Sequence, residues 1–355
     1  MALAATPWTW SGAQVVRIPQ IQSSAAPPLA ADQDTRSPQQ ELKIGGDLTR
    51  HGSLQEAIPH LVEARKLGAD PYATGVNLGI CYLGTGRNKE AIAILELLRA
   101  GGSRTPTVDK LLAQAYVADG QLRAAYGAFT EASAANPKDE SVYEFFADAC
   151  TDHQQYAVGL HAVERGLQEL PDSARLHYER AVFLARLGRL DEGKPEFDRA
   201  TQLEPGGYIG YLALVQKELY DEDLAGAKET LRRAIKAGHR DYQMLSLLGT
   251  VLLHEGAAPG QPEFAEAEAA LEESAKDRPD YSATQIALGK VYLMQGQFQD
   301  AVDHLERARN LEPDNPTVYS NLASAYSRLG DRARARQMEA QVARLLAEKK
   351  SSSIP

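Results

Sequence analysis

The sequence has few of the residues that form redox or membrane-spanning sites. It contains two cysteines in 355 residues, Cys81 and Cys150, and aromatic residues make up 7% of the chain. We expect both cysteines to be small buried apolar residues. A redox or metal role would need partner residues that the sequence does not offer. No stretch of 18 apolar residues occurs, so no transmembrane helix is expected.

Catalytic motifs are missing as well. The eight histidines include no pair at i, i+4, and the sequence lacks a P-loop, a Gly-x-Ser-x-Gly, a Cys-x-x-Cys and a dinucleotide-binding glycine motif. We therefore expect no catalytic residue, no metal site and no cofactor. The net charge of −10 argues against nucleic-acid binding, which requires cationic side chains that neutralise phosphates.

What the chain does have is a period of 34 residues. Small residues recur at this step, with Val215 as the one larger residue: Gly45, Gly79, Ala113, Ala147, Ala181, Val215, Gly249, then, after one step of 40, Gly289 and Ala323. A second series keeps the same register, again with one step of 40, from Ala227 to Ala267: Ala57, Ala91, Ala125, Gly159, Gly193, Ala227, then Ala267, Ala301 and Ala335. A fixed period of this size is typical of a stacked repeat protein.

Nine repeats account for most of the chain. They are 38–71, 72–105, 106–139, 140–173, 174–207, 208–241, 242–281, 282–315 and 316–349, with a tail at 350–355. Residues 1–37 are rich in Pro, Ala, Ser and Gln, a composition that predicts disorder. An apolar stretch at 2–10 followed by small residues at 11–13 leaves a signal-like segment as the alternative, although a basic start is missing.

Each repeat is expected to form two helices. In 282–315 an apolar stripe precedes Gly296, which ends the first helix, and a second stripe at three- and four-residue spacing follows. The small residues of the two series, which we call landmark residues, let the two helices of a repeat approach closely. The repeat 242–281 holds six extra residues between Gly249 and Ala267, in a segment with loop composition. We expect a longer turn there, either functional or neutral. Glu339 stands at a normally apolar position, as a solvent-facing end cap requires.

These features resemble the tetratricopeptide repeat (TPR). The residues that carry the resemblance are an aromatic near the start of the repeat, a Leu-Gly pair and a closing proline: Tyr143, Tyr211, Tyr319; Leu78-Gly79, Leu288-Gly289; Pro137, Pro171, Pro205, Pro279, Pro313. The resemblance implies an all-α fold, an α-solenoid that forms a right-handed superhelix of about nine helix-turn-helix repeats. It also implies a concave groove, lined by first helices, that binds extended peptides or partner helices. The lysine and asparagine set that clamps chaperone C-termini is not found here.

The family geometry places repeat positions 2, 5, 6, 9, 12 and 13 in this groove. The resulting candidate binding residues are Glu144, Phe145, Asp148, Asp152, Arg175, Tyr178, Glu179, Gln216 and Tyr220. Three carboxylates on one helix face beside aromatic side chains favour a partner segment that carries Lys or Arg and an apolar anchor. The alternative is an ordinary solvated helix face.

We therefore expect a non-catalytic protein-protein interaction scaffold. The alternative is a structural subunit that acts mainly by self-association, which a concentration-dependent mass would reveal. The expected partner is a protein or peptide, not nucleic acid, and the oligomeric state is open. Localisation is open too, with a soluble cytoplasmic protein favoured over an exported or periplasmic one.

Overall fold

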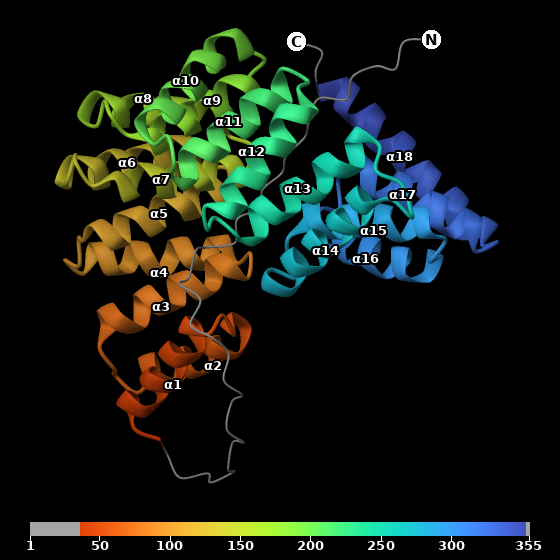
Figure 1. Cartoon of the computed structure of the whole chain (residues 1–355). Helices are drawn as coiled ribbons and strands as arrows, with labels where there is room; N and C mark the ends of the chain where they lie inside the picture. The colour runs from red at the N-terminus through yellow and green to blue at the C-terminus, as the bar shows by residue number, and fades with distance from the viewer. Residues whose placement is uncertain (1–35, 353–355) are drawn as a thin grey trace. The chain divides into compact units, whose positions relative to one another are not determined.

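The computed structural model describes residues 36–352, and side chains up to residue 348. The expectations for 1–35 and 353–355 lie outside the described residues. In the part described, the contacts divide the chain into two units, 36–193 and 194–352, and each unit is described separately. Figure 1 shows successive helices lying side by side within each unit.

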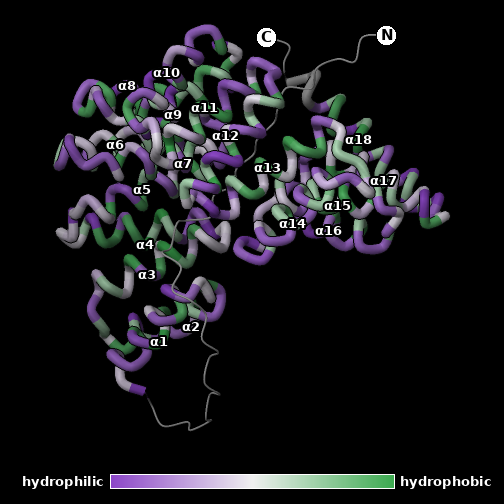
Figure 2. The backbone as a smooth tube through the Cα atoms, in the orientation of Figure 1, coloured by the Kyte–Doolittle hydropathy of each residue, from purple (hydrophilic) through white to green (hydrophobic). Residues whose placement is uncertain are grey.

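Helices are the only regular secondary structure in residues 36–352, which confirms the all-α fold. Its eighteen helices pack in consecutive pairs, as a solenoid of about nine repeats requires. They are α1 (Pro38–Arg50), α2 (Leu54–Lys66), α3 (Pro71–Gly84), α4 (Asn88–Ala100), α5 (Pro106–Ala118), α6 (Leu122–Ala135), α7 (Glu140–Asp152), α8 (Tyr156–Glu169), α9 (Ala174–Arg186), α10 (Leu190–Leu203), α11 (Tyr208–Tyr220), α12 (Leu224–Lys236), α13 (Tyr242–Glu255), α14 (Pro262–Asp277), α15 (Ser282–Gln295), α16 (Phe298–Leu311), α17 (Pro316–Arg328) and α18 (Arg332–Ser352). Hydrophobic and hydrophilic residues alternate along the helices (Figure 2), because each helix buries one face and exposes another.

The small landmark residues lie where the two helices of a pair come closest. A Cβ atom added to Gly289 of α15 would lie 2.5 Å from Cγ of Leu305 on α16. At Gly79 of α3 it would lie 2.8 Å from Leu95 of α4. Both leucines are fully buried. The period seen in the sequence is therefore a period of close helix-helix contacts.

The extra residues of the seventh repeat do not all enter the turn. The turn between α13 and α14 has six residues, Gly256 to Gln261, whereas the equivalent turn after α3 has three. Counted from the landmark Gly249, α13 ends one residue later than α3 does from Gly79. Helix α14 begins two residues further ahead of its landmark, Ala267. The expectation of a longer turn is met for half of the insertion, and the other half lengthens the helices.

Hydrogen bonds to the closing prolines join consecutive repeats. The hydroxyl of Tyr143 donates to the carbonyl of Pro137 at 2.9 Å, and the hydroxyl of Tyr319 donates to that of Pro313 at 2.7 Å. Two other residue types make the same contact six residues back: His177 lies 3.0 Å from the Pro171 carbonyl, and the Gln285 amide donates to Pro279 at 2.8 Å. A proline carbonyl that ends one repeat therefore accepts a bond from the next.

The core and the C-terminal helix follow the sequence pattern. Both cysteines are buried and neither forms a disulfide. Burial raises the pKa of the Cys81 and Cys150 thiols, which disfavours the reactive thiolate. Glu339 on α18 is exposed, and α18 buries Ala335 and Met338 against α17. This helix continues to Ser352, three residues beyond the end expected for the last repeat.

Candidate functional site

Three neighbouring first helices of the 36–193 unit form one continuous face. Helices α5, α7 and α9 follow one another in the stack, with α7 in contact with both others. Lys110 of α5 donates to the hydroxyl of Ser141 on α7 at 3.1 Å, which ties the first two together. We name this surface the α5–α7–α9 face. Its residues are Lys110, Gln114, Ser141, Glu144, Phe145, Asp148, Thr151, Asp152, Arg175, Tyr178 and Glu179.

An ion cluster lies at the centre of this face. The guanidinium of Arg175 lies 3.0 Å from Asp148 and 2.7 Å from Glu179. Arg175 and Glu179 are one helical turn apart on α9, whereas Asp148 comes from α7. Arg175 is 9% exposed and Glu179 is 5% exposed, so this charge pair lies largely out of solvent. The alternative of a solvated helix face does not describe these two residues.

The cluster carries more carboxylates than cations. Glu144 lies close enough to raise the pKa of both Arg175 and Glu179, as Asp148 does. Burial is the largest cause that raises the pKa of Glu179 to about 7, and the guanidinium of Arg175 opposes it. The face therefore has an excess of negative charge around one buried cation.

Three polar atoms on the same face have no hydrogen-bond partner within the described part of the chain. They are Oε1 of Gln114, Oγ1 of Thr151 and Nε of Arg175. Each atom is itself buried, and each comes from a different helix of the face. A buried polar atom without a partner costs about 1–3 kcal/mol, so such atoms call for an explanation. The three include an acceptor, a hydroxyl and a donor.

The hydroxyl of Thr151 differs from those of several other threonines in this chain. Each of five helical or helix-capping threonines donates its hydroxyl to the carbonyl four residues earlier: Thr49, Thr74, Thr85, Thr130 and Thr201. The hydroxyl of Thr151 makes no such bond among the described residues. Its capacity to form a hydrogen bond is therefore unused within the described part of the chain.

The predicted site residues lie on three helices: α7 and α9 in one unit and α11 in the other. Glu144, Phe145, Asp148 and Asp152 lie on α7, half-buried, and Phe145 packs against the core. Tyr178, like its α9 neighbours, is buried rather than open to solvent. Gln216 and Tyr220 lie on α11, in the other unit, where Gln216 is buried and the ring of Tyr220 stacks on Phe197 at 5.9 Å.

Neither Thr151 nor Gln114 is among the binding residues predicted from the sequence. Their repeat positions, 12 and 9, already marked them as groove residues. Nothing in the sequence says that their polar atoms lack partners.

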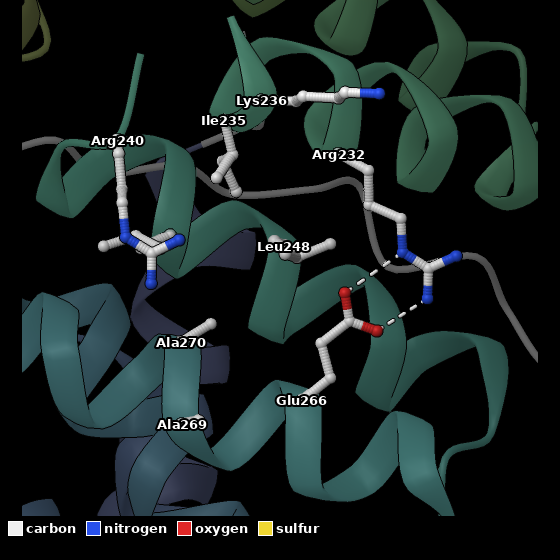
Figure 3. A pocket seen from close by; sticks show the side chains of 9 residues that line it. Arg232, Ile235, Lys236, Arg240, Leu248, Glu266, Ala269 and Ala270 are labelled. Carbon is white, nitrogen blue, oxygen red and sulfur yellow. Dashed lines mark hydrogen bonds and ion pairs between the residues drawn. The ribbon is translucent and has the colours of Figure 1, made fainter. Parts of the chain in front are cut away.

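A hollow of about 280 Å³ lies in the other unit, between α12, α13 and α14, and its lining includes the apolar residues Ile235, Leu245 and Leu248. A bidentate ion pair lies beside this hollow: Arg232 donates to both carboxylate oxygens of Glu266, at 3.0 and 2.6 Å (Figure 3). Its volume is slightly below that of typical ligand sites. The pair links consecutive second helices.

Within residues 36–352 no group of three or more His, Cys, Asp or Glu side chains is arranged to hold a metal ion. No helix in the same range has both the length and the apolar character needed to cross a bilayer.

Stacked helix pairs with a recurring close contact define the class of this chain: it is an α-solenoid repeat protein. Family models described as TPR repeat or tetratricopeptide repeat match residues 48–115, 146–208 and 289–330. The chain belongs to the tetratricopeptide repeat family, as the resemblance indicated. Proteins of this family typically mediate protein interactions and are generally non-catalytic.

Solved structures agree on the fold. The chain is similar to a tetratricopeptide repeat protein from Parabacteroides merdae, with 16% identity, a TM-score of 0.51, and coverage of 72% of this chain and 98% of that one. It is also similar to a chain of the APC/C hetero-tetramer Cut9-Hcn1, with 13% identity, a TM-score of 0.53, and coverage of 87% and 74% respectively. No curated protein matches the sequence.

Proposed function

We propose that this protein is a non-catalytic scaffold that binds an extended peptide segment on the α5–α7–α9 face. The observation that carries the proposal is the set of unpartnered polar atoms on Gln114, Thr151 and Arg175. An extended peptide brings a row of backbone N–H and C=O groups that no secondary structure has satisfied. Its carbonyls suit the Arg175 donor, and its N–H groups suit the Gln114 acceptor.

The charge of the face supports a basic residue in that peptide. Asp148 and Glu179 share Arg175, while Glu144 adds a further carboxylate nearby. A Lys or Arg side chain placed there would reduce the repulsion between these carboxylates. The half-buried ring of Phe145 offers contact area for an apolar anchor beside it.

The experiment compares variants that remove one polar atom and keep the shape. Thr151→Val and Gln114→Met should weaken binding of fluorescein-labelled Arg-containing extended peptides by about tenfold each, equivalent to about 1.4 kcal/mol. The same variants should leave the free protein equally stable or more stable, because they remove an unsatisfied polar atom. Binding is measured by fluorescence anisotropy and stability by urea unfolding.

A matched control is Thr130→Val. In the unaltered chain the Thr130 hydroxyl donates to the carbonyl of Tyr126 within α6, away from the α5–α7–α9 face. This variant should lose stability and keep its peptide affinity. If Thr151→Val behaves like Thr130→Val, the peptide does not use the Thr151 hydroxyl and the proposal fails. Removing Asp148 is a poor test, because it also strips the buried Arg175 of a partner.

A structural subunit that acts by self-association remains the alternative. Sedimentation of the full chain across a hundredfold concentration range distinguishes the two. A mass that rises with concentration, together with no peptide binding, would favour self-association.

A further inference from the structure

The chain itself contains a segment with the chemistry that the α5–α7–α9 face requires. We propose that residues 15–21, Val-Val-Arg-Ile-Pro-Gln-Ile, bind this face within the same molecule and compete with outside partners. The inference rests on the proposed function and names an occupant for its site. It concerns residues that precede the described part of the chain.

The first argument is charge. Arg17 is the one Lys or Arg among residues 1–35. It is therefore the one side chain of that stretch able to supply a fixed cation to the carboxylates around Arg175. Four branched apolar residues surround it, Val15, Val16, Ile18 and Ile21. A basic residue between apolar anchors is the partner chemistry that the face favours.

The second argument is backbone conformation. Ile18 precedes Pro19, and a residue before proline is disfavoured in the helical region and shifted to extended geometry. Val and Ile favour extended backbone as well. An extended segment presents its carbonyl and N–H groups to both sides. These are the groups that could satisfy Gln114 Oε1, Thr151 Oγ1 and Arg175 Nε, the buried atoms without a partner among the described residues.

The third argument is reach. Nineteen residue steps separate Arg17 from Arg36, the first described residue, which precedes α1. An extended chain of that length spans roughly 60 Å. First helices of the stack follow one another as α1, α3, α5 and α7, at roughly 10 Å per step, so α7 lies about 30 Å from α1. The linker is long enough to let residues 15–21 bind α7 and α9 of the same chain.

The test uses a reporter that the chain already carries. Trp8 and Trp10 are its two tryptophans, and both lie close to Arg17 in sequence. Tryptophan anisotropy of the full chain therefore reports on the N-terminal segment alone. Arg17→Glu should lower this anisotropy, whereas Arg17→Lys and the control Gln33→Glu, which adds one negative charge to the same stretch, should leave it unchanged. A fall of similar size with Gln33→Glu would overturn the proposal.

A second measurement tests competition. The probe is a labelled synthetic peptide of residues 12–24, added to the full chain. Full-length Arg17→Glu should bind it at least tenfold more tightly than the unaltered chain, because the internal competitor is lost. Thr151→Val in the Arg17→Glu background should then weaken the probe again.

The outcomes separate this inference from the proposed function. Equal probe affinity for the unaltered chain and Arg17→Glu, weakened by Thr151→Val in both, would retain the peptide site and reject binding of residues 15–21 to the face of their own molecule. No probe binding to either chain would reject residues 15–21 as a ligand, and the Arg-containing peptides of the preceding section would then decide the site itself. Anisotropy and mass that both rise with protein concentration would mean that the segment binds a second copy, which overturns binding within one molecule.

Discussion

At the scale of single residues, Glu179 makes the stability of the ion cluster depend on pH. Its pKa is raised by burial to about 7, from an ordinary value of 4.5. The folded state therefore holds this proton more tightly than the unfolded state. Between about pH 4.5 and pH 7 the unfolded state binds fewer protons, so this residue's contribution to stability falls as the pH rises.

Glu179→Gln places a neutral amide at this position that does not titrate, so this variant should not show the fall in stability with rising pH. We expect the melting temperature of the unaltered chain to drop relative to Glu179→Gln as the pH is raised from 5 to 7. Thermal unfolding followed by circular dichroism measures both. Glu63→Gln is the control, because Glu63 is exposed and bonds to Lys66 at 2.9 Å. Melting temperatures that change with pH by the same amount in the unaltered chain and in Glu179→Gln would contradict a raised pKa for Glu179.

The tyrosines near the start of the repeats allow a second prediction at this scale. Tyr143→Phe removes the bond to the Pro137 carbonyl and keeps the buried ring. It should lower the free energy of unfolding by about 1 kcal/mol, the usual net value of one hydrogen bond. Tyr211 occupies the same repeat position in the other unit. Its hydroxyl makes no hydrogen bond to a described residue, so Tyr211→Phe should change stability by much less in the same urea titration.

At the scale of elements, two glycines inside helices should respond to alanine in opposite ways. At Gly289 a new Cβ would meet Cγ of the buried Leu305 at 2.5 Å, so Gly289→Ala should cost about 1–3 kcal/mol by overpacking. At Gly127 of α6 nothing lies within 4 Å of the new atom. Gly127→Ala should raise stability by up to about 1 kcal/mol through helix propensity. Urea unfolding of the two variants decides, and equal signs would contradict the packing argument.

The helices were largely predictable because each close contact within a helix pair requires a small residue at a fixed position of the repeat. The spacing of Gly249, Gly289 and their equivalents gave the helix contacts, since only a small residue fits so close to a facing leucine. The division of the seventh repeat's insertion was not predictable. Proline and glycine mark a turn, but the sequence did not show that part of the insertion would lengthen α13 and α14.

The candidate site was predictable only as a set of positions. Repeat register placed Asp148 and Arg175 on one face. Their pairing depends on how α7 and α9 pack, and so do the burial of Glu179 and the lone hydroxyl of Thr151. Such facts are properties of neighbouring helices, and a single sequence records them weakly.

At the scale of the whole molecule, contacts link helices that are close in the sequence. A solenoid of this kind has no single core that responds as a unit. Leu95→Ala in α4 removes a fully buried side chain and should cost about 2.7–5 kcal/mol. Hydrogen exchange should accelerate in α3, α4 and α5 and remain unchanged in α15 to α17.

The matched variant is Leu305→Ala in α16, whose side chain is equally buried. Its exchange pattern should be the reverse, with α15 to α17 affected and α3 to α5 protected as before. Faster exchange over the whole chain in either variant would mean that the repeats unfold together. Mass spectrometry of peptides from the exchanged protein provides the measurement.

The hydrogen bonds to the closing prolines also bear on how the molecule responds to force. Each joins the last residues of one repeat to the first helix of the next, so each breaks only when that junction opens. Tension applied to the two ends acts on such junctions in series, and the weakest one opens first. A stretched molecule should therefore lengthen in steps of one repeat, each releasing roughly 110 Å of chain for 34 residues. Junctions that contain the tyrosine bond should open after those that lack it.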